Sequence, residues 1–147
     1  MLNFRVYGYG SRLSLALVAV TIITSIFCSV RAADPYPFEM KKKFPKAFAA
    51  YQKMVPDRYR KVKWIYSLEA TAGPMATVQC GGKKCLTGSV CQPHDCGGNE
   101  FAYLVAVDGS NAVGLLRSAN LTNGKDVLFG KPDTAQLELL KKQLTPE

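Results

Sequence analysis

The sequence has few of the residues and motifs on which most enzyme chemistry depends. Its 147 residues contain one histidine and one tryptophan, and its 11 acidic residues are scattered. It has no Ser–His–Asp set with a local signature, no glycine-rich phosphate loop and no closely spaced pair of catalytic carboxylates. It also has no Cys-x-x-Cys pair, the usual arrangement of a thiol redox site. These absences argue against an enzyme, although they say nothing of carboxylates that only the fold would bring together.

The sequence also lacks a run of about twenty apolar residues, the length that a membrane-spanning helix needs. Its most apolar stretch, residues 13–27, follows two arginines and ends just before small residues at the −3 and −1 positions of a cut after Ala32. This pattern predicts a cleavable secretory signal peptide over residues 1–32. The alternatives are a membrane anchor and a lipoprotein processed at Cys28, for which the bulky Phe27 is poorly suited.

The predicted cleavage leaves one domain-sized segment, residues 33–147. It removes three of the 19 basic residues and none of the acidic ones, so 115 residues remain with a formal net charge of +5. That length is normal for one small domain. Export removes cytosolic and nuclear partners from consideration, so we expect no nucleic-acid ligand. The sequence leaves open whether the protein is a monomer or a homodimer.

Positive charge is concentrated near the start of this segment. Nine lysine or arginine residues and one acidic residue, Asp57, lie between Lys41 and Lys63. One interpretation is attraction to anionic polymers of the cell wall or cell surface. The other is an ordinary solvated face of a helix and its following loop, and we favour it from the sequence alone.

Four cysteines follow the predicted cleavage point, which in an exported domain indicates disulfides. Three connectivities are open from sequence alone. Proximity favours two local rings, one joining Cys80 to Cys85 across a turn and the other joining Cys91 to Cys96. The same cysteines and His94 could instead form a small zinc or thiol-redox module. Their spacings differ from the ligand pairs of common zinc sites, so we expect no metal and no cofactor.

The second ring encloses the only histidine, in the sequence Cys-Gln-Pro-His-Asp-Cys at residues 91–96. A six-residue ring removes only about 2 kcal/mol of unfolded-chain entropy, so its main effect is to fix the shape of one loop. Pro93 restricts the backbone, Asp95 can accept hydrogen bonds from nearby backbone N–H groups, and two glycines let the chain leave sharply. We predict that His94 lies at the tip of a stiff projection that is ordered before it binds. The alternative is a stapled surface loop with an incidental histidine.

An imidazole at such a tip suits a target cleft that contains two carboxylates, because it can donate and accept hydrogen bonds, or donate twice when it is charged.

The rest of the chain predicts an α+β domain. Apolar residues at i, i+4, i+7 and i+11 from Phe44 predict a helix that ends at Pro56, after a mobile lead-in over residues 33–43. Asp133 as N-cap, with Gln136 three residues on, predicts a C-terminal helix. Between these helices, strands are predicted over residues 62–66, 77–80, 85–87, 101–107, 112–116 and 127–129, with turns at residues 81–84, 108–111 and 123–124. The order predicts a single antiparallel sheet of about five strands, flanked by short helices and carrying a protruding disulfide-closed loop.

The loop sequence resembles the marker of a known family, the inhibitors of vertebrate lysozyme (Ivy). The marker is a protruding C-x-P-H-D-C loop, matched here by Cys91, Pro93, His94, Asp95 and Cys96. A looser resemblance runs from Lys46 to about Phe129 and includes Trp64, Thr77, Val78, Gly81 and Gly97. Three features depart from the family pattern: the Cys80 and Cys85 pair, Gln92 where a lysine is expected, and a basic domain facing lysozymes that are usually basic.

The resemblance implies a periplasmic protein that is not an enzyme. Its loop enters the active-site cleft of a c-type lysozyme, where His94 bonds to the two catalytic carboxylates. Cys91 and Cys96 hold the loop closed, and Pro93 and Asp95 shape it. The runner-up target is a lytic transglycosylase of the same cell, in which case the protein would restrain the cell's own peptidoglycan-cleaving enzymes.

Overall fold

The structure is a computed structural model that describes residues 34–144, which we call the described unit. The predicted signal peptide, residues 1–32, lies outside the described residues. Among the helices that are described, none has the length and apolar character needed to cross a membrane.

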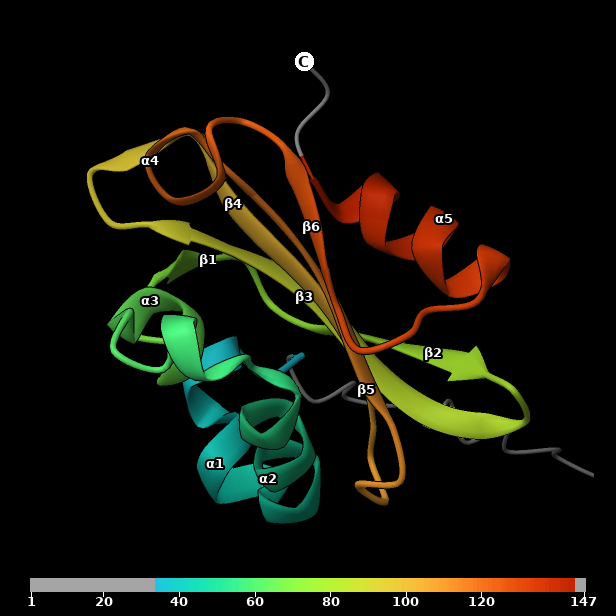
Figure 1. Ribbon diagram of the computed structural model, residues 1–147. Coiled ribbons are helices and arrows are strands. Elements are labelled where there is room, and N and C mark those ends of the chain that lie inside the picture. The colour runs from blue at the N-terminus through green and yellow to red at the C-terminus, as the bar shows by residue number, and fades with distance from the viewer. Residues whose placement is uncertain (1–33, 145–147) are drawn as a thin grey trace, which may run out of the picture. The chain divides into compact units, whose positions relative to one another are not determined.

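A six-stranded antiparallel sheet forms the centre of this unit (Figure 1). Its spatial order is β1-β3-β4-β5-β6, and β2 pairs with β3 beside β1, along the same edge. The prediction of a single antiparallel sheet is confirmed. Five of the predicted strand segments correspond to β2, β3, β4, β5 and β6. The sixth strand of the sheet is the two-residue β1, which was not predicted. The strands are β1 (Thr71–Ala72), β2 (Ala76–Cys80), β3 (Lys83–Gln92), β4 (Asp95–Ala106), β5 (Ala112–Ser118) and β6 (Asp126–Phe129).

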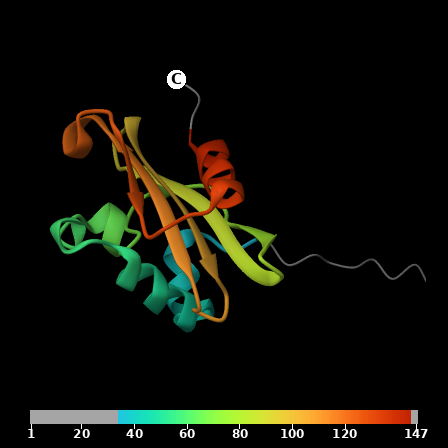
Figure 2. The same ribbon diagram turned by 45° about the vertical axis from the view of Figure 1, so that its right-hand side comes forward.

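Helices cover both faces of the sheet, as Figures 1 and 2 show. The N-terminal elements pack on one face, and α5 (Thr134–Gln143) packs on the other. A short helix, α4 (Ala119–Thr122), connects β5 to β6. The predicted flanking helices are therefore confirmed. The N-terminal elements are η1 (Pro37–Glu39), α1 (Met40–Lys43), α2 (Pro45–Met54), η2 (Asp57–Tyr59) and α3 (Lys63–Tyr66).

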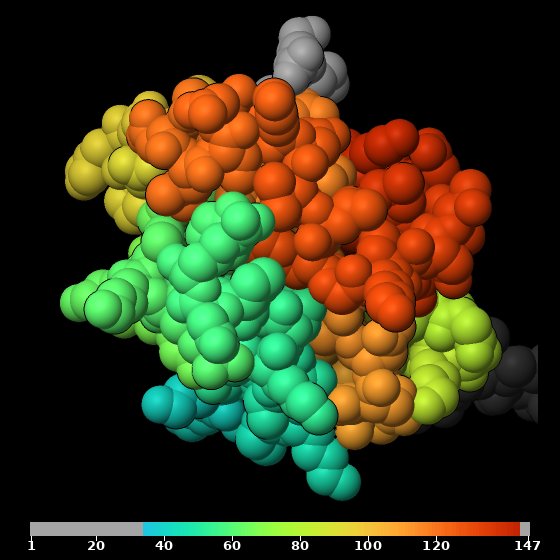
Figure 3. Space-filling model, viewed as in Figure 1, coloured from blue at the N-terminus to red at the C-terminus, as the bar shows by residue number. Residues whose placement is uncertain are grey.

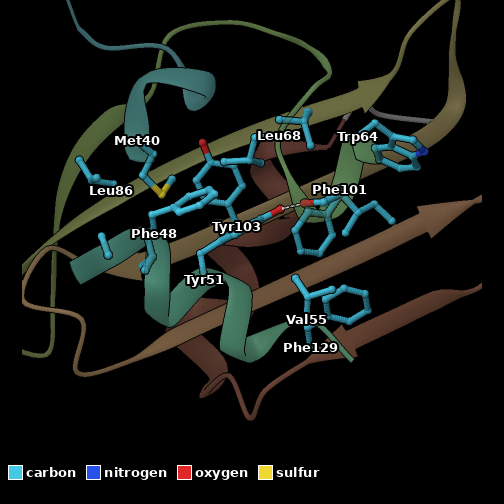
Figure 4. Close-up of a cluster of buried hydrophobic side chains, with 14 of the residues drawn as sticks. Met40, Phe48, Tyr51, Val55, Trp64, Leu68, Leu86, Phe101, Tyr103 and Phe129 are labelled. Atoms are coloured by element: carbon cyan, nitrogen blue, oxygen red, sulfur yellow. Dashed lines mark hydrogen bonds between the residues drawn. The ribbon is translucent and has the colours of Figure 1, made fainter. Parts of the chain in front are cut away.

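The central strand β4 supplies side chains to two separate hydrophobic clusters. Phe101, Tyr103 and Val105 face the N-terminal helices, whereas the alternate residues Ala102 and Leu104 face α5. This alternation is the period of two of a strand that is buried on both faces. The larger cluster is aromatic (Figure 4). In it the Tyr51 ring meets the Tyr103 ring edge to face, with 5.4 Å between ring centroids, and the Tyr51 hydroxyl donates a hydrogen bond to the carbonyl of Ile65.

The predicted helix ends are confirmed at both ends of the unit. α2 begins at Pro45 and ends at Met54, before Pro56. In α5, the Asp133 side chain accepts a hydrogen bond from the Gln136 backbone, and the Gln136 side chain accepts one from the Asp133 backbone.

The prediction of a strand over residues 62–66 is wrong, because this segment forms α3. Trp64 and Ile65 are adjacent and both buried, and Leu68, four residues after Trp64, is buried as well. A strand would have sent Trp64 and Ile65 to opposite faces. A helical turn directs Trp64 and Ile65 into the aromatic cluster, where Leu68, two residues after the helix, also packs. This packing overrides the β-propensity of the segment.

Two local expectations also need correction. The lead-in predicted to be mobile contains η1 and α1, and Met40 is fully buried in the core. Asn123 and Gly124 have positive φ angles of 53° and 74°, as the turn signal requires, but they end α4 instead of joining two strands directly. The connection from β5 to β6 is therefore longer than a two-residue hairpin.

Candidate functional site: a disulfide-closed loop at the tip of the β3–β4 hairpin

The loop predicted from the sequence forms the tip of the long β3–β4 hairpin, which extends beside α4 in Figure 1. Gln92 pairs with Asp95, so Pro93 and His94 form a two-residue turn. His94 has a φ of 64°, a left-handed conformation that is uncommon for residues with a side chain. Proline at the first turn position and a positive φ at the second define a type II turn. Pro93, His94 and Asp95 are all exposed.

The base of the turn is irregular on the β4 side only. Cys91 pairs with Glu100 and the next residue of β3, Gln92, pairs with Asp95, so four residues of β4 lie between two successive pairs. Gly98, within this bulge, has a φ of 79°. Its left-handed backbone lets β4 turn out of the ladder and back, which confirms that the chain leaves the ring sharply.

Both predicted disulfides are present, and they lie at opposite ends of β3. Cys91 and Cys96 are joined with their Cα atoms 4.9 Å apart, and Cys80 and Cys85 are joined with their Cα atoms 6.0 Å apart. A type II turn fits the twist of paired strands less well than the primed turns that hairpins prefer. The Cys91–Cys96 bond therefore holds together two strands that this turn would tend to splay.

A network of side-chain hydrogen bonds fixes the loop to the corner between β5 and α4. Its centre is Asn99, which is 2% exposed. The Asn99 amide nitrogen donates to the Asp95 carboxylate at 3.1 Å, and the Asn99 amide oxygen accepts from the Ser118 hydroxyl at 2.6 Å. Asn120 donates from its amide nitrogen to the Asp95 carboxylate at 3.0 Å and to the Gln92 amide oxygen at 3.4 Å.

This network corrects the role expected for Asp95. The sequence predicted hydrogen bonds from neighbouring backbone N–H groups, whereas the side-chain amides of Asn99 and Asn120 make the contacts to its carboxylate. The Asp95 carboxylate therefore connects the loop to Asn99 of β4 and Asn120 of α4. Sequence reasoning missed Asn99, Ser118 and Asn120. The only local signal was Ser118, a typical N-cap residue, whose hydroxyl accepts the backbone N–H of Leu121.

His94 is the one aromatic side chain of the exposed turn, and the network constrains Gln92 and Asp95 on either side of it. The surroundings contain acidic groups. Asp95 is exposed, and Glu100 lines a shallow hollow beside Cys91. The Asp126 carboxylate accepts two hydrogen bonds from the Arg117 guanidinium, at 2.8 and 3.1 Å, where β5 and β6 end near α4.

The zinc alternative would need the cysteines as free thiolates, and the two disulfides engage all four sulfurs. Within residues 34–144, no group of three or more His, Cys, Asp or Glu side chains is arranged to hold a metal ion.

Comparison with known proteins identifies the family. The chain belongs to the family described as "Inhibitor of vertebrate lysozyme (Ivy)", whose match covers residues 47–146. It is also similar to the uncharacterized protein PA5481 of Pseudomonas aeruginosa, with 33% identity over 104 residues, which are 65% of this chain and 67% of that protein. The matched region includes the sheet, both disulfides and the whole network around the loop.

Proposed function

We propose that this protein is a periplasmic inhibitor of lysozyme that acts by inserting the loop of residues 91–96 into the active-site cleft. The observation that carries the proposal is an exposed His94 at the tip of a turn that is closed by a disulfide and fixed from the side by Asn99 and Asn120. Membership of the family supports inhibition as the class of function. Residues 1–32 would direct export and be removed after Ala32.

The proposed mechanism follows from the chemistry of the target. A retaining glycosidase holds two carboxyl groups about 5 Å apart, one protonated and one ionised. An imidazole between them can accept a hydrogen bond from the acid and donate one to the carboxylate. His94 would then occupy the position of the scissile bond while offering no glycosidic oxygen to protonate. Inhibition would be competitive with peptidoglycan.

The pre-ordered loop explains how so small a contact could bind tightly. Ordering a flexible loop on binding subtracts from the affinity, and a loop that is already fixed avoids most of that cost. Here the disulfide, the left-handed turn and the side-chain network all act before contact. The loop therefore needs little rearrangement to enter a cleft.

The mature protein and its proposed target are both basic, so their net charges would repel each other. Net charge governs long-range attraction, but the groups at the interface decide local complementarity. Asp95 lies in the loop and is exposed, whereas most lysines of the N-terminal segment lie on α1, α2 and the segments that follow them. The loop would thus offer an acidic contact at the cleft of a basic target.

The test is a peptidoglycan lysis assay with a c-type lysozyme and, separately, with a lytic transglycosylase, each with and without the purified protein. We expect concentration-dependent inhibition of the lysozyme, relieved by excess substrate. Inhibition of the transglycosylase alone would identify restraint of the cell's own enzymes as the function. Inhibition of neither enzyme would contradict the proposal.

A further inference from the structure

A second surface of the molecule has features that the inhibitor role does not use. Two aromatic side chains in and next to η1, Tyr36 and Phe38, are 42% and 63% exposed. Their rings stack on each other, with centroids 5.5 Å apart and an interplanar angle of 17°. Stacked aromatic rings exposed at a surface are a feature of interaction sites.

Lysines lie on the same side of this short helical segment as Phe38. Lys41 and Lys42 follow Phe38 by three and four residues, the spacing of neighbours on one helix face. Pro37 and Met40 are buried and define the opposite face. Both lysines are exposed. The segment therefore presents aromatic rings and ammonium groups together, and we call Tyr36, Phe38, Lys41 and Lys42 the aromatic–lysine corner.

More positive charge follows this corner along the chain, at Lys43 and Lys46. The β4–β5 turn packs against the backbone of Lys46, and Lys46 shares a shallow hollow with Lys83 and Lys84 at the start of β3. Asp108 lines the same hollow. Hydrogen bonds from Ser110 and Lys83 lower the pKa of its carboxyl to about 2, so it keeps its negative charge and offsets only part of the positive charge.

This basic region lies at the opposite end of β3 from the inhibitory loop. β3 begins at Lys83 and ends at Gln92, and ten residues at about 3.3 Å each span about 30 Å. Figure 3 shows the N-terminal segment at the lower edge of the visible face and the β3–β4 hairpin at the upper left. A partner could therefore cover the basic end while the loop stays free to bind an enzyme.

We propose that the aromatic–lysine corner docks onto an anionic phospholipid surface. Phenyl and phenol rings enter the boundary between headgroups and acyl chains, while lysines extend their ammonium groups to the phosphates. Each lysine near an anionic leaflet adds to the attraction. Exposed rings next to exposed lysines match the two zones of such a surface, the acyl boundary and the phosphates.

The test is co-sedimentation of the purified protein with vesicles of phosphatidylcholine alone and with added phosphatidylglycerol. The protein would be isolated from the cells that export it, and its N-terminus determined by mass spectrometry. We expect stronger binding to the anionic vesicles. Both Tyr36→Ser with Phe38→Ser and Lys41→Gln with Lys42→Gln should lower the partition coefficient about tenfold or more. All variants should inhibit lysozyme as the parent does, so this result is separable from the inhibitor proposal.

Matched controls remove the same chemistry elsewhere. Leu128→Ser removes an apolar side chain that is 47% exposed on β6, and Lys141→Gln with Lys142→Gln removes two exposed charges from α5. Both controls should bind anionic vesicles like the parent. The proposal is overturned if the controls lose as much binding as the corner variants, or if the corner variants bind normally. It is also overturned if the parent binds both kinds of vesicle equally, or sediments with purified peptidoglycan instead.

Discussion

Asn120 is an exposed residue whose side chain contacts the loop from outside it. Its amide nitrogen donates to Asp95 and Gln92, one on each side of the turn. We predict that Asn120→Ala weakens inhibition by about 1 kcal/mol, the usual net value of a lost hydrogen bond. The free energy of unfolding should change by less than about 0.5 kcal/mol, as for most surface substitutions.

The matched control for this variant is Asn111→Ala, an exposed asparagine in the β4–β5 turn at the other end of the sheet. Inhibition constants and urea unfolding of both variants provide the comparison. Equal inhibition by the Asn120 and Asn111 variants would show that the network does not position the loop.

Replacing each of two buried tyrosines with phenylalanine should have opposite effects on stability. Burial raises the pKa of both phenols, so both hydroxyls stay protonated. The Tyr51 hydroxyl donates to the Ile65 carbonyl, whereas the Tyr103 hydroxyl is buried and has no hydrogen-bond partner among residues 34–144. Tyr51→Phe should therefore destabilise the fold by about 1–2 kcal/mol, and Tyr103→Phe should be neutral or stabilising. Urea unfolding measures both, and equal destabilisation would contradict this account.

At the residue scale, the sequence predicts the loop well, but it does not predict the residues that hold the loop in place from outside it. The residues of the ring are consecutive, so proline, cysteine and glycine rules apply to them directly. Asn99 and Asn120 lie 21 residues apart and meet only because β4 pairs with β5. No local rule connects them, and neither residue type indicates a partner by itself. The left-handed backbone of His94 was not predicted either, because most histidines do not adopt it although the residue type is enriched there.

At the scale of elements, the two disulfides provide an internal comparison. Each closes a ring of six residues, so each should contribute about 2 kcal/mol of unfolded-chain entropy. Only Cys91–Cys96 closes the proposed binding loop. We predict that Cys91→Ser with Cys96→Ser lowers the affinity for lysozyme while circular dichroism changes little.

The control is Cys80→Ser with Cys85→Ser, at the far end of β3. It should lower the free energy of unfolding by a similar amount and leave inhibition unchanged. If the two double variants inhibit equally, the loop disulfide serves stability alone. If the first one unfolds grossly, the ring is structural and does not act by pre-ordering the loop.

The ends of helices that carry capping residues or prolines were predicted closely. Elements whose position depends on contacts with distant parts of the chain were not. α5 has a capping box and α2 lies between two prolines, so their ends follow from local chemistry. α3 has neither signal, and its side chains are placed by the aromatic cluster that Phe101 and Tyr103 build from β4. β4 itself begins at Asp95, six residues before the predicted strand, because the polar segment of the bulge still pairs in part.

At the scale of the whole molecule, the described unit has two ends with different character. The loop end carries the exposed histidine and nearby carboxylates, and the other end carries lysines from α1, α2 and β3. The sequence showed a basic segment at residues 41–63. It did not show that β3 brings Lys83 and Lys84 to the same end, because that follows from the sheet register.

The proposed export predicts where the mature protein begins. The protein isolated from the cell envelope should begin at Ala33, because the apolar run of residues 13–27 and the small residues before the cut match the pattern of a signal peptide. Intact-mass measurement would show the loss of residues 1–32. A protein that retains them would indicate an anchor, and one that begins at Cys28 would indicate a lipoprotein.

The most direct test of the central claim is the inhibition of a c-type lysozyme by His94→Asn beside the parent protein. Asparagine tolerates the left-handed backbone of this position, so the turn should keep its shape while the imidazole is lost. His94→Ala serves as the second variant. We predict that both fold normally and inhibit more weakly by about 2 kcal/mol or more, the scale of a central contact in an interface. Inhibition by both variants as strong as that of the parent would contradict the account.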